Sequence, residues 1–163
     1  MGIRRDLVLG DIAEIKVVNL LNHVGLSAEK NSDKTTRKFY DIIVKTKTVE
    51  FTVEVKNDIY AVRSGNIAIE LFNPKSGKPS GLGVTTSMVW VVMIGEELWL
   101  ANTERLKKYV NNTKPKRIID SAGDGNALIY LYDRDIILPT NFTRVDNISN
   151  KQTLKRTIVN ELD

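Results

Sequence analysis

The side chains that could do chemistry in this sequence gather in one predicted β-hairpin. In its second strand, Glu50–Lys56, successive side chains should point to opposite faces, so that Glu54 and Lys56 share one face. Val53 and Val55 then point to the other face, toward a hydrophobic core. The strand therefore presents a carboxylate and an ammonium group on the same side.

The first strand of the hairpin supplies a second acid. If Lys47–Thr48 forms a two-residue turn, Asp41 lies directly opposite Glu54, and Lys45 lies opposite Glu50 as a favourable charge pair. Directly opposed residues have Cβ atoms roughly 5 Å apart. Two carboxylates at that separation repel each other, and a divalent cation bound between them would remove the repulsion.

Two acids, a lysine and a divalent cation are components that can hydrolyse a phosphodiester. A cation held by Asp41 and Glu54 would make hydroxide accessible near neutral pH and would neutralise the scissile phosphate. The Lys56 ammonium group would hold the attacking water and stabilise the charge that develops on the phosphate. The alternative is a solvated hairpin face with ordinary salt bridges.

A further acid lies on the predicted first helix, residues 6–24. Successive helical residues turn by about 100°, so Glu14 falls on the apolar stripe of Leu7, Val18 and Leu21. A carboxylate on a core-facing stripe is costly unless something compensates it. We therefore expect Glu14 to reach into the same site, either to complete a ligand shell or as part of a second metal site.

The remaining pattern predicts an α/β fold, with a mixed central β-sheet flanked by helices, in a single domain over residues 1–163. The nearly continuous apolar run 87–94 is typical of a buried central strand. A helix is expected from Thr103 to Val110, with Asn102 as its cap. Further strands are predicted at 26–30, 39–45, 67–71, 98–100, 127–132 and 136–138, and a C-terminal helix at 150–162.

The composition restricts the chemistry further. The sequence has no cysteine and one histidine, which excludes disulfides, thiol nucleophiles and Cys/His zinc sites and argues against a histidine-based triad. A bound metal would then be a hard cation held by oxygens, namely Mg²⁺, Mn²⁺ or Ca²⁺. The net charge of +4 and the pI near 9.2 favour an anionic partner.

No apolar run in the sequence reaches the roughly 18–20 residues that a membrane-spanning helix needs. The N-terminal segment, whose predicted helix carries Asp11, Glu14 and Lys16, lacks the pattern of a secretory signal. On these grounds we expect a cytoplasmic protein without a membrane partner.

Together, these acids and the lysine resemble the active site of the PD-(D/E)xK nuclease superfamily, whose restriction-endonuclease-like fold also includes Holliday junction resolvases and phage nucleases. The matching residues are Glu14 on the first helix, Asp41 on one strand and Glu54-Val55-Lys56 on the next. The order of helix, hairpin, further strand, loop and buried strand also matches, over roughly residues 5 to 110. One departure is Tyr40, which precedes Asp41 where the motif has proline.

The resemblance implies a site, a cofactor and a partner. Asp41 and Glu54 would bind Mg²⁺, for which Mn²⁺ substitutes, and the Val55 carbonyl would be a further ligand. Lys56 would be catalytic, with Glu14 as the additional acid. The partner would be DNA.

Five residues outside the hairpin are weaker candidates. Glu70 faces away from the apolar side of its strand and would serve as an accessory acid, with a surface salt bridge as the alternative. Lys75, Lys78 and Ser80 lie on a Gly/Pro/Ser-rich loop suited to phosphate contacts, and Arg63 would touch the DNA backbone. The alternative for these four is an ordinary solvated surface.

The sequence as a whole predicts a metal-dependent DNA endonuclease, and its small size is compatible with a homodimer that makes two cuts. The alternatives are a Holliday junction resolvase and a non-catalytic nucleic-acid-binding protein on the same scaffold. An interaction module without a nucleic-acid role rests only on the ordinary composition. The intact set of two acids and a lysine argues against the non-catalytic alternative.

Overall fold

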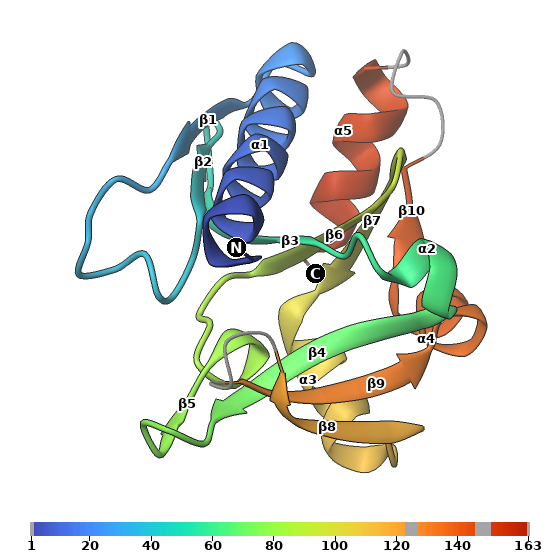
Figure 1. Cartoon of the computed structure of the whole chain (residues 1–163). Helices are drawn as coiled ribbons and strands as arrows, with labels where there is room; N and C mark the ends of the chain where they lie inside the picture. Colours follow the sequence, from blue (N-terminus) through green and yellow to red (C-terminus); the bar gives the residue numbers. More distant parts are fainter. Residues whose placement is uncertain (1, 123–126, 146–150, 163) are drawn as a thin grey trace.

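The computed structural model describes residues 2–122, 127–145 and 151–162, and a mixed β-sheet of six strands runs through the middle of this part (Figure 1). Neighbouring strands are antiparallel except β3 and β6, which are parallel. In spatial order the strands are β1 (Ser27–Lys30), β2 (Ile42–Lys45), β3 (Glu50–Asn57), β6 (Val89–Ile94), β7 (Glu97–Asn102) and β10 (Thr143–Arg144).

Strand β6 lies at the centre of the hydrophobic core because both of its faces are covered. All six of its residues are buried. Their side chains alternate between two clusters, with Val89, Val91 and Met93 in one and Trp90, Val92 and Ile94 in the other. The expected central strand is thereby confirmed, since a strand hidden on both faces is apolar throughout.

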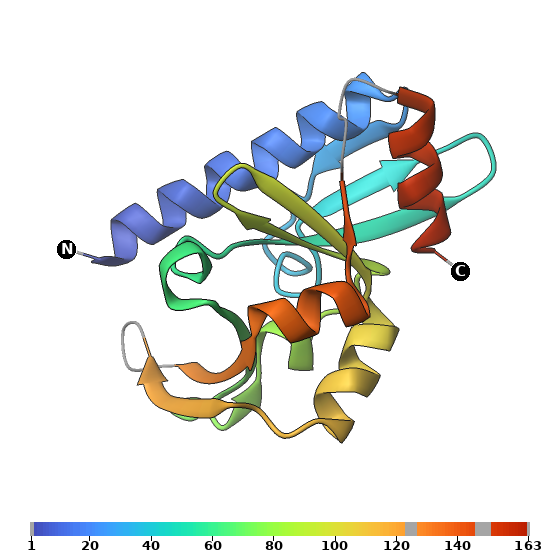
Figure 2. The ribbon, with the colours of Figure 1, turned by 90° about the vertical axis from the view of Figure 1, so that its right-hand side faces the viewer.

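Two helices, α1 (Gly2–His23) and α5 (Lys151–Asn160), cover one face of this sheet (Figures 1 and 2). Ala13, Val17 and Leu21 repeat at four-residue intervals along α1 and are buried against the sheet, together with Ile158 of α5. None of the described helices combines the length and the apolar character needed to cross a membrane.

The opposite face of the six-stranded sheet packs against a second, antiparallel sheet and two helices. The strands of the second sheet are, in spatial order, β5 (Lys78–Pro79), β4 (Asn66–Asn73), β9 (Ala127–Asp133) and β8 (Arg117–Ala122). The helices are α3 (Thr103–Asn112) and α4 (Arg134–Asn141), while α2 (Ala61–Ser64) and the 3-10 helix η1 (Gly81–Gly83) are short connections. The predicted fold class is confirmed, and the second sheet adds a layer that the sequence pattern did not indicate.

The strand predicted at 136–138 is wrong, because these residues lie in α4. The side chain of Asp133 begins this helix by accepting a hydrogen bond of 3.0 Å from the Asp135 amide. Asp135 itself carries negative charge in the first turn, where the helix dipole favours it. The cap predicted for α3 is confirmed, since Asn102 accepts from the Arg105 amide at 3.0 Å.

Candidate active site

The β2–β3 hairpin has the register that its turn predicts. The Thr46 amide donates to the Val49 carbonyl at 2.8 Å, which closes the two-residue turn between them. Regular pairing then runs along both strands until Ile42 lies opposite Val53. Val53 and Val55 are buried on the core side, as expected, and Glu54 and Lys56 lie on the other side.

Asp41 leaves the ladder one residue beyond this point. Its amide donates to the Val53 carbonyl at 2.9 Å, while its side-chain Oδ2 accepts from the Val55 amide at 2.8 Å. Because the amide and carbonyl of one strand residue point to the same edge, the Val55 carbonyl also faces the edge that β2 has left. The Asp41 carboxylate and the Val55 carbonyl therefore meet at the same edge of β3.

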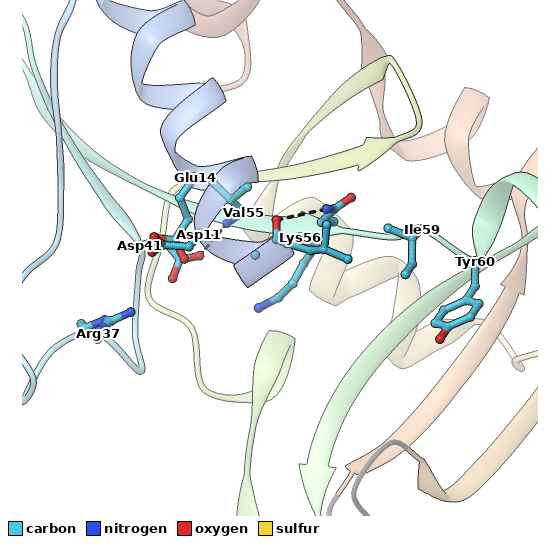
Figure 3. A pocket seen from close by; sticks show the side chains of 11 residues that line it. Asp11, Glu14, Arg37, Asp41, Val55, Lys56, Ile59 and Tyr60 are labelled. Atoms are coloured by element: carbon cyan, nitrogen blue, oxygen red, sulfur yellow. Dashed lines mark hydrogen bonds between the residues drawn. The ribbon is translucent and has the colours of Figure 1, made fainter. Parts of the chain in front are cut away.

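An open cavity of about 320 Å³ lies at this edge (Figure 3). In Figure 3 the carboxyl groups of Asp11, Glu14 and Asp41 gather on one side of it, near Val55 and Lys56. The full set of lining residues is Leu9, Gly10, Asp11, Glu14, Arg37, Asp41, Val55, Lys56, Asn57, Ile59 and Tyr60. Helix α1, the loop before β2 and the end of β3 thus build one cavity from distant parts of the sequence.

The position of Glu14 on the apolar side of α1 is compensated by an ion pair. Its Oε2 lies 2.8 Å from the Lys30 ammonium group, which also binds Asp11. The Glu14 side chain is 15% exposed and that of Lys30 is 28% exposed, so the pair is partly shielded from water. Lys30 is the last residue of β1, and its partnership with α1 explains how an acid is tolerated there.

Glu54 lies behind the cavity rather than on its wall. It is 6% exposed, its Oε1 accepts a hydrogen bond from the Lys56 ammonium group, and its Oε2 lies 3.4 Å from the Thr85 hydroxyl. The same ammonium group lies 5.3 Å from the centre of the Trp90 ring. Lys56 therefore connects the buried acid to the solvent-filled cavity.

The surroundings of Asp41 disfavour the ionised form of its carboxyl group. Burial, with a contribution from the charge of Glu54, raises the pKa of Asp41 to about 7, although Lys56 and the Val55 amide act in the opposite direction. Burial also opposes the charge of Lys56, but the acids around it outweigh this effect and raise its pKa. At Asp41, burial and the charge of Glu54 thus outweigh the stabilising effect of Lys56 on the carboxylate.

Glu70 lies in a neighbouring cavity of about 240 Å³ that shares Lys56, Asn57 and Tyr60 with the first. Its charge contributes to the raised pKa of Lys56. The backbone of η1 approaches it so closely that a Cβ added to Gly81, which has a φ of 53°, would lie 2.6 Å from the Glu70 carbonyl oxygen. This close approach fixes the backbone at Glu70, whose side chain lines the adjoining cavity together with Lys56.

The predicted phosphate contacts lie outside the cavity that contains Asp41, as far as the described residues show. Arg63, Lys75 and Lys78 are exposed; Arg63 lies in α2, Lys75 in the turn between β4 and β5, and Lys78 at the start of β5. Ser80 is half-buried, and its hydroxyl is enclosed with no hydrogen-bond partner in the described part of the chain. A phosphate could reach that hydroxyl only if the surrounding loop moved.

Arg37 and Tyr60 are among the residues of this cavity that the sequence pattern did not single out. Arg37 is an exposed cation in the loop before β2, and Tyr60, at the start of α2, is 72% exposed. The loop of Arg37 reads as polar and irregular, so nothing in the sequence marks it as part of a cavity wall. The exposed ring of Tyr60 gives the cavity an apolar side opposite its charged one.

At the level of sequence, no family model and no curated protein matches the chain. Among solved structures, the bacterial homing endonuclease I-Ssp6803I is similar over 93% of this chain and 95% of its own, with a TM-score of 0.51 and 14% identity. The two chains share a fold, a mixed central sheet flanked by helices. A second similar structure is Hjc, a Holliday junction resolvase from the archaeal hyperthermophile Archaeoglobus fulgidus, with 88% of this chain and 95% of that chain covered, a TM-score of 0.46 and 8% identity.

Proposed function

We propose that the protein is a metal-dependent DNA endonuclease that hydrolyses phosphodiester bonds, with Asp41, Glu54 and Lys56 at its catalytic centre. The observation that carries this proposal is the meeting of the Asp41 carboxylate and the Val55 carbonyl in an open cavity beside the Lys56 ammonium group. The resemblance of these residues to the PD-(D/E)xK active site, the fold shared with a homing endonuclease and the net charge of +4 agree with a nuclease acting on a polyanion.

The donor chemistry of the site fits Mg²⁺ or Mn²⁺. Asp41, Glu54, Glu14 and the Val55 carbonyl offer only oxygens, and a divalent cation would offset the cost of ionising the buried Asp41 beside Glu54. In the described residues no three acidic side chains are grouped to hold a cation together. A cation would have to compete with Lys30 for Glu14 and with Lys56 for Glu54.

Besides metal binding, the proposed reaction needs side chains that stabilise charge on the phosphate and that bind the DNA backbone. When bound, the cation would activate water and neutralise charge on the phosphate. Lys56 reaches the cavity with its ammonium group and would stabilise the charge that develops on the scissile phosphate. Arg37 would bind a neighbouring phosphate, Glu70 would act as an accessory acid through Lys56, and Arg63, Lys75 and Lys78 would contact the DNA backbone farther away.

Incubation with DNA tests the proposal directly. Supercoiled, linear, single-stranded and four-way-junction DNA would be incubated with Mg²⁺, with Mn²⁺ and with EDTA, and products separated on gels. We expect cleavage with either metal and none in EDTA. An Asp41→Asn protein purified in the same way controls for contaminating nucleases, and undiminished cleavage in EDTA would overturn the mechanism.

The same panel separates the alternatives. Cleavage confined to the four-way junction would identify a junction resolvase, and DNA retention without cleavage in any metal would identify a non-catalytic binding protein. A homodimer would be expected to cut both strands in one encounter, and light scattering of the protein alone and with DNA would measure its mass.

A metal titration distinguishes a ligand role of Glu14 from a purely structural one. If Glu14 binds the metal, Lys30→Met should free it and enlarge the increase in Tm caused by Mn²⁺, whereas Glu14→Gln should shrink that increase. A tenfold gain in affinity corresponds to about 1.4 kcal/mol of added stabilisation under saturating metal.

The matched control is Lys45→Met. Lys45 also contacts two acids, Glu29 at 3.7 Å and Glu50 at 3.9 Å, but its side chain is far more exposed to solvent than that of Lys30. It should leave the effect of Mn²⁺ on Tm unchanged. If Lys30→Met and Glu14→Gln both lower Tm in EDTA and leave the Mn²⁺ effect at its wild-type size, Glu14 is only the structural partner of Lys30.

A further inference from the structure

Tyr60 carries a large aromatic side chain on the surface, at one end of the cavity that contains Asp41. It is 72% exposed, and among the described residues no cation and no second aromatic ring packs against it. In Figure 3 the acids lie on one side of Lys56 and the Tyr60 ring lies on the other. The ring thus offers an exposed apolar face beside the candidate active site.

The backbone that carries this ring is fixed on three sides by Asp58. The Asp58 carboxylate accepts from the Ala61 amide and from the Ala68 amide, each at 3.0 Å, and so joins the start of α2 to β4. The Asp58 amide donates to the Met93 carbonyl at 2.9 Å, which joins the same segment to β6. A ligand that packs on the Tyr60 ring therefore has little backbone to order, which favours binding.

Two adjoining cavities meet at Tyr60. The cavity of about 320 Å³ contains Asp41, and the cavity of about 240 Å³ lies between the end of β3, α2 and the second sheet. Lys56 and Asn57 line both cavities, as Tyr60 does. A DNA strand with a phosphate at Lys56 would therefore bring a nearby nucleotide to the Tyr60 ring.

The lining of the 240 Å³ cavity suits a nucleobase better than a phosphate. Trp90, Ala68 and Ile129 give it apolar surface. Asp58 and Glu70 give it two carboxyl groups, which repel a phosphate when they are ionised. A nucleobase is uncharged and has two flat faces, and the amino groups of adenine, cytosine and guanine can donate to a carboxylate.

We infer that Tyr60 is a stacking platform for one nucleobase near the scissile phosphate, and that this base lies outside a duplex. Within a duplex each base is paired and stacked on its neighbours, so neither of its faces is free to pack on a side chain. The substrate class that follows is DNA with an unpaired nucleotide beside the cleavage point. The cleavage of such DNA rests on the proposed function, whereas the stacking contact requires only that the protein binds DNA.

The test compares three single variants of the full chain on three DNAs. Tyr60→Ala removes the ring, and Tyr60→Phe keeps it. Val62→Ala is the matched control, because Val62 is another exposed apolar residue of α2, 56% exposed, that lines neither cavity. The DNAs are a single strand, a blunt duplex, and a strand of abasic residues that has the backbone charge of the single strand but no bases. Affinities would be measured by fluorescence anisotropy with Ca²⁺.

Tyr60→Ala should weaken binding of the single strand about 5- to 150-fold, as loss of one base stacked on an aromatic ring does. Its affinity for the duplex and for the abasic strand should stay near that of the wild type, because neither offers a free base face. Tyr60→Phe and Val62→Ala should bind all three DNAs as the wild type does.

Three results would overturn the stacking role of Tyr60. They are an unchanged affinity of Tyr60→Ala for the single strand, an equal loss on the abasic strand, which would indicate a contact with the sugar or phosphate, and a Tyr60→Phe protein as weak as Tyr60→Ala. A wild type that does not bind the single strand also overturns it, while cleavage of duplex DNA by that protein would leave the proposed function standing. If the wild type binds DNA and cleaves none, the proposed catalysis fails and the affinities alone decide the stacking role.

Discussion

Replacement of Lys56 by alanine is expected to lower the rate of DNA cleavage roughly 100- to 1,000-fold, because a preorganised group that stabilises developing charge is lost. DNA affinity should change little, since a single cation within the cavity contributes only one of many phosphate contacts. The ammonium group is held by Glu54 and lies over Trp90, so it is already oriented before DNA arrives. Single-turnover cleavage rates and anisotropy titrations measure the two quantities separately.

Lys38→Ala provides a matched control for this variant. Lys38 also lies over an aromatic ring, that of Phe39, at 4.7 Å, but it is exposed on the loop beside the cavity. It should weaken DNA binding slightly and leave the cleavage rate of bound DNA unchanged. A Lys56→Ala protein that cleaves as fast as the wild type would reduce Lys56 to a structural ion pair with Glu54.

Replacement of Asp41 by asparagine is expected to have two opposite effects. Cleavage should fall below roughly 1% of the wild-type rate, because the acid at the edge of β3 is lost. Stability in EDTA should rise, because the folded protein no longer holds a buried carboxylate next to Glu54. The gain at pH 8 should be on the order of a few kcal/mol.

The sign of the stability effect follows from the raised pKa of Asp41. Folding brings this pKa from 3.8 to about 7, so the folded state binds the proton more tightly than the unfolded state. Wild-type stability is therefore highest below pH 4 with respect to this group, and it is lost as the pH rises toward 7. The asparagine variant lacks this dependence, so the two proteins should diverge between pH 4 and pH 8.

Denaturant unfolding across that pH range in EDTA measures the difference. Asp33→Asn is the control of opposite sign, because hydrogen bonds from Thr35 lower the pKa of Asp33. That variant should be less stable than the wild type at pH 8. If Asp41→Asn is no more stable than the wild type at pH 8, Asp41 does not carry unrelieved charge in the folded protein.

The hairpin could be predicted from the sequence because its geometry is short-range. A two-residue turn fixes the register, and alternation fixes the faces, so the side of Glu54 and Lys56 followed from local rules. The departure of Asp41 from the ladder could not be predicted in this way. It depends on the neighbouring strand, since the Asn31 amide donates to the Asp41 carbonyl at 2.7 Å.

The partners of the acids were missed for a related reason. Lys30 contacts α1 across 19 residues of sequence at Asp11, and Thr85 contacts Glu54 across 31. No periodicity or spacing rule connects residues so far apart, and a lone lysine or threonine in a polar segment carries no signal. The helix α4 was misassigned because a short apolar run fits a strand or a helix equally well until its cap is considered.

On the proposed function, Lys30 and Lys56 have a consequence for how the protein would bind a cation. In the folded protein, Lys30 and Lys56 are counterions of Glu14 and Glu54 and offset part of the repulsion between the acids. In small zinc domains, by contrast, metal binding supplies the folding free energy itself. On the proposed function, a divalent cation would bind to the already folded protein by displacing the lysine ammonium groups from the carboxylates. Such a protein would fold and remain folded without the metal ion. The concentration of the ion would then control its activity and not its stability.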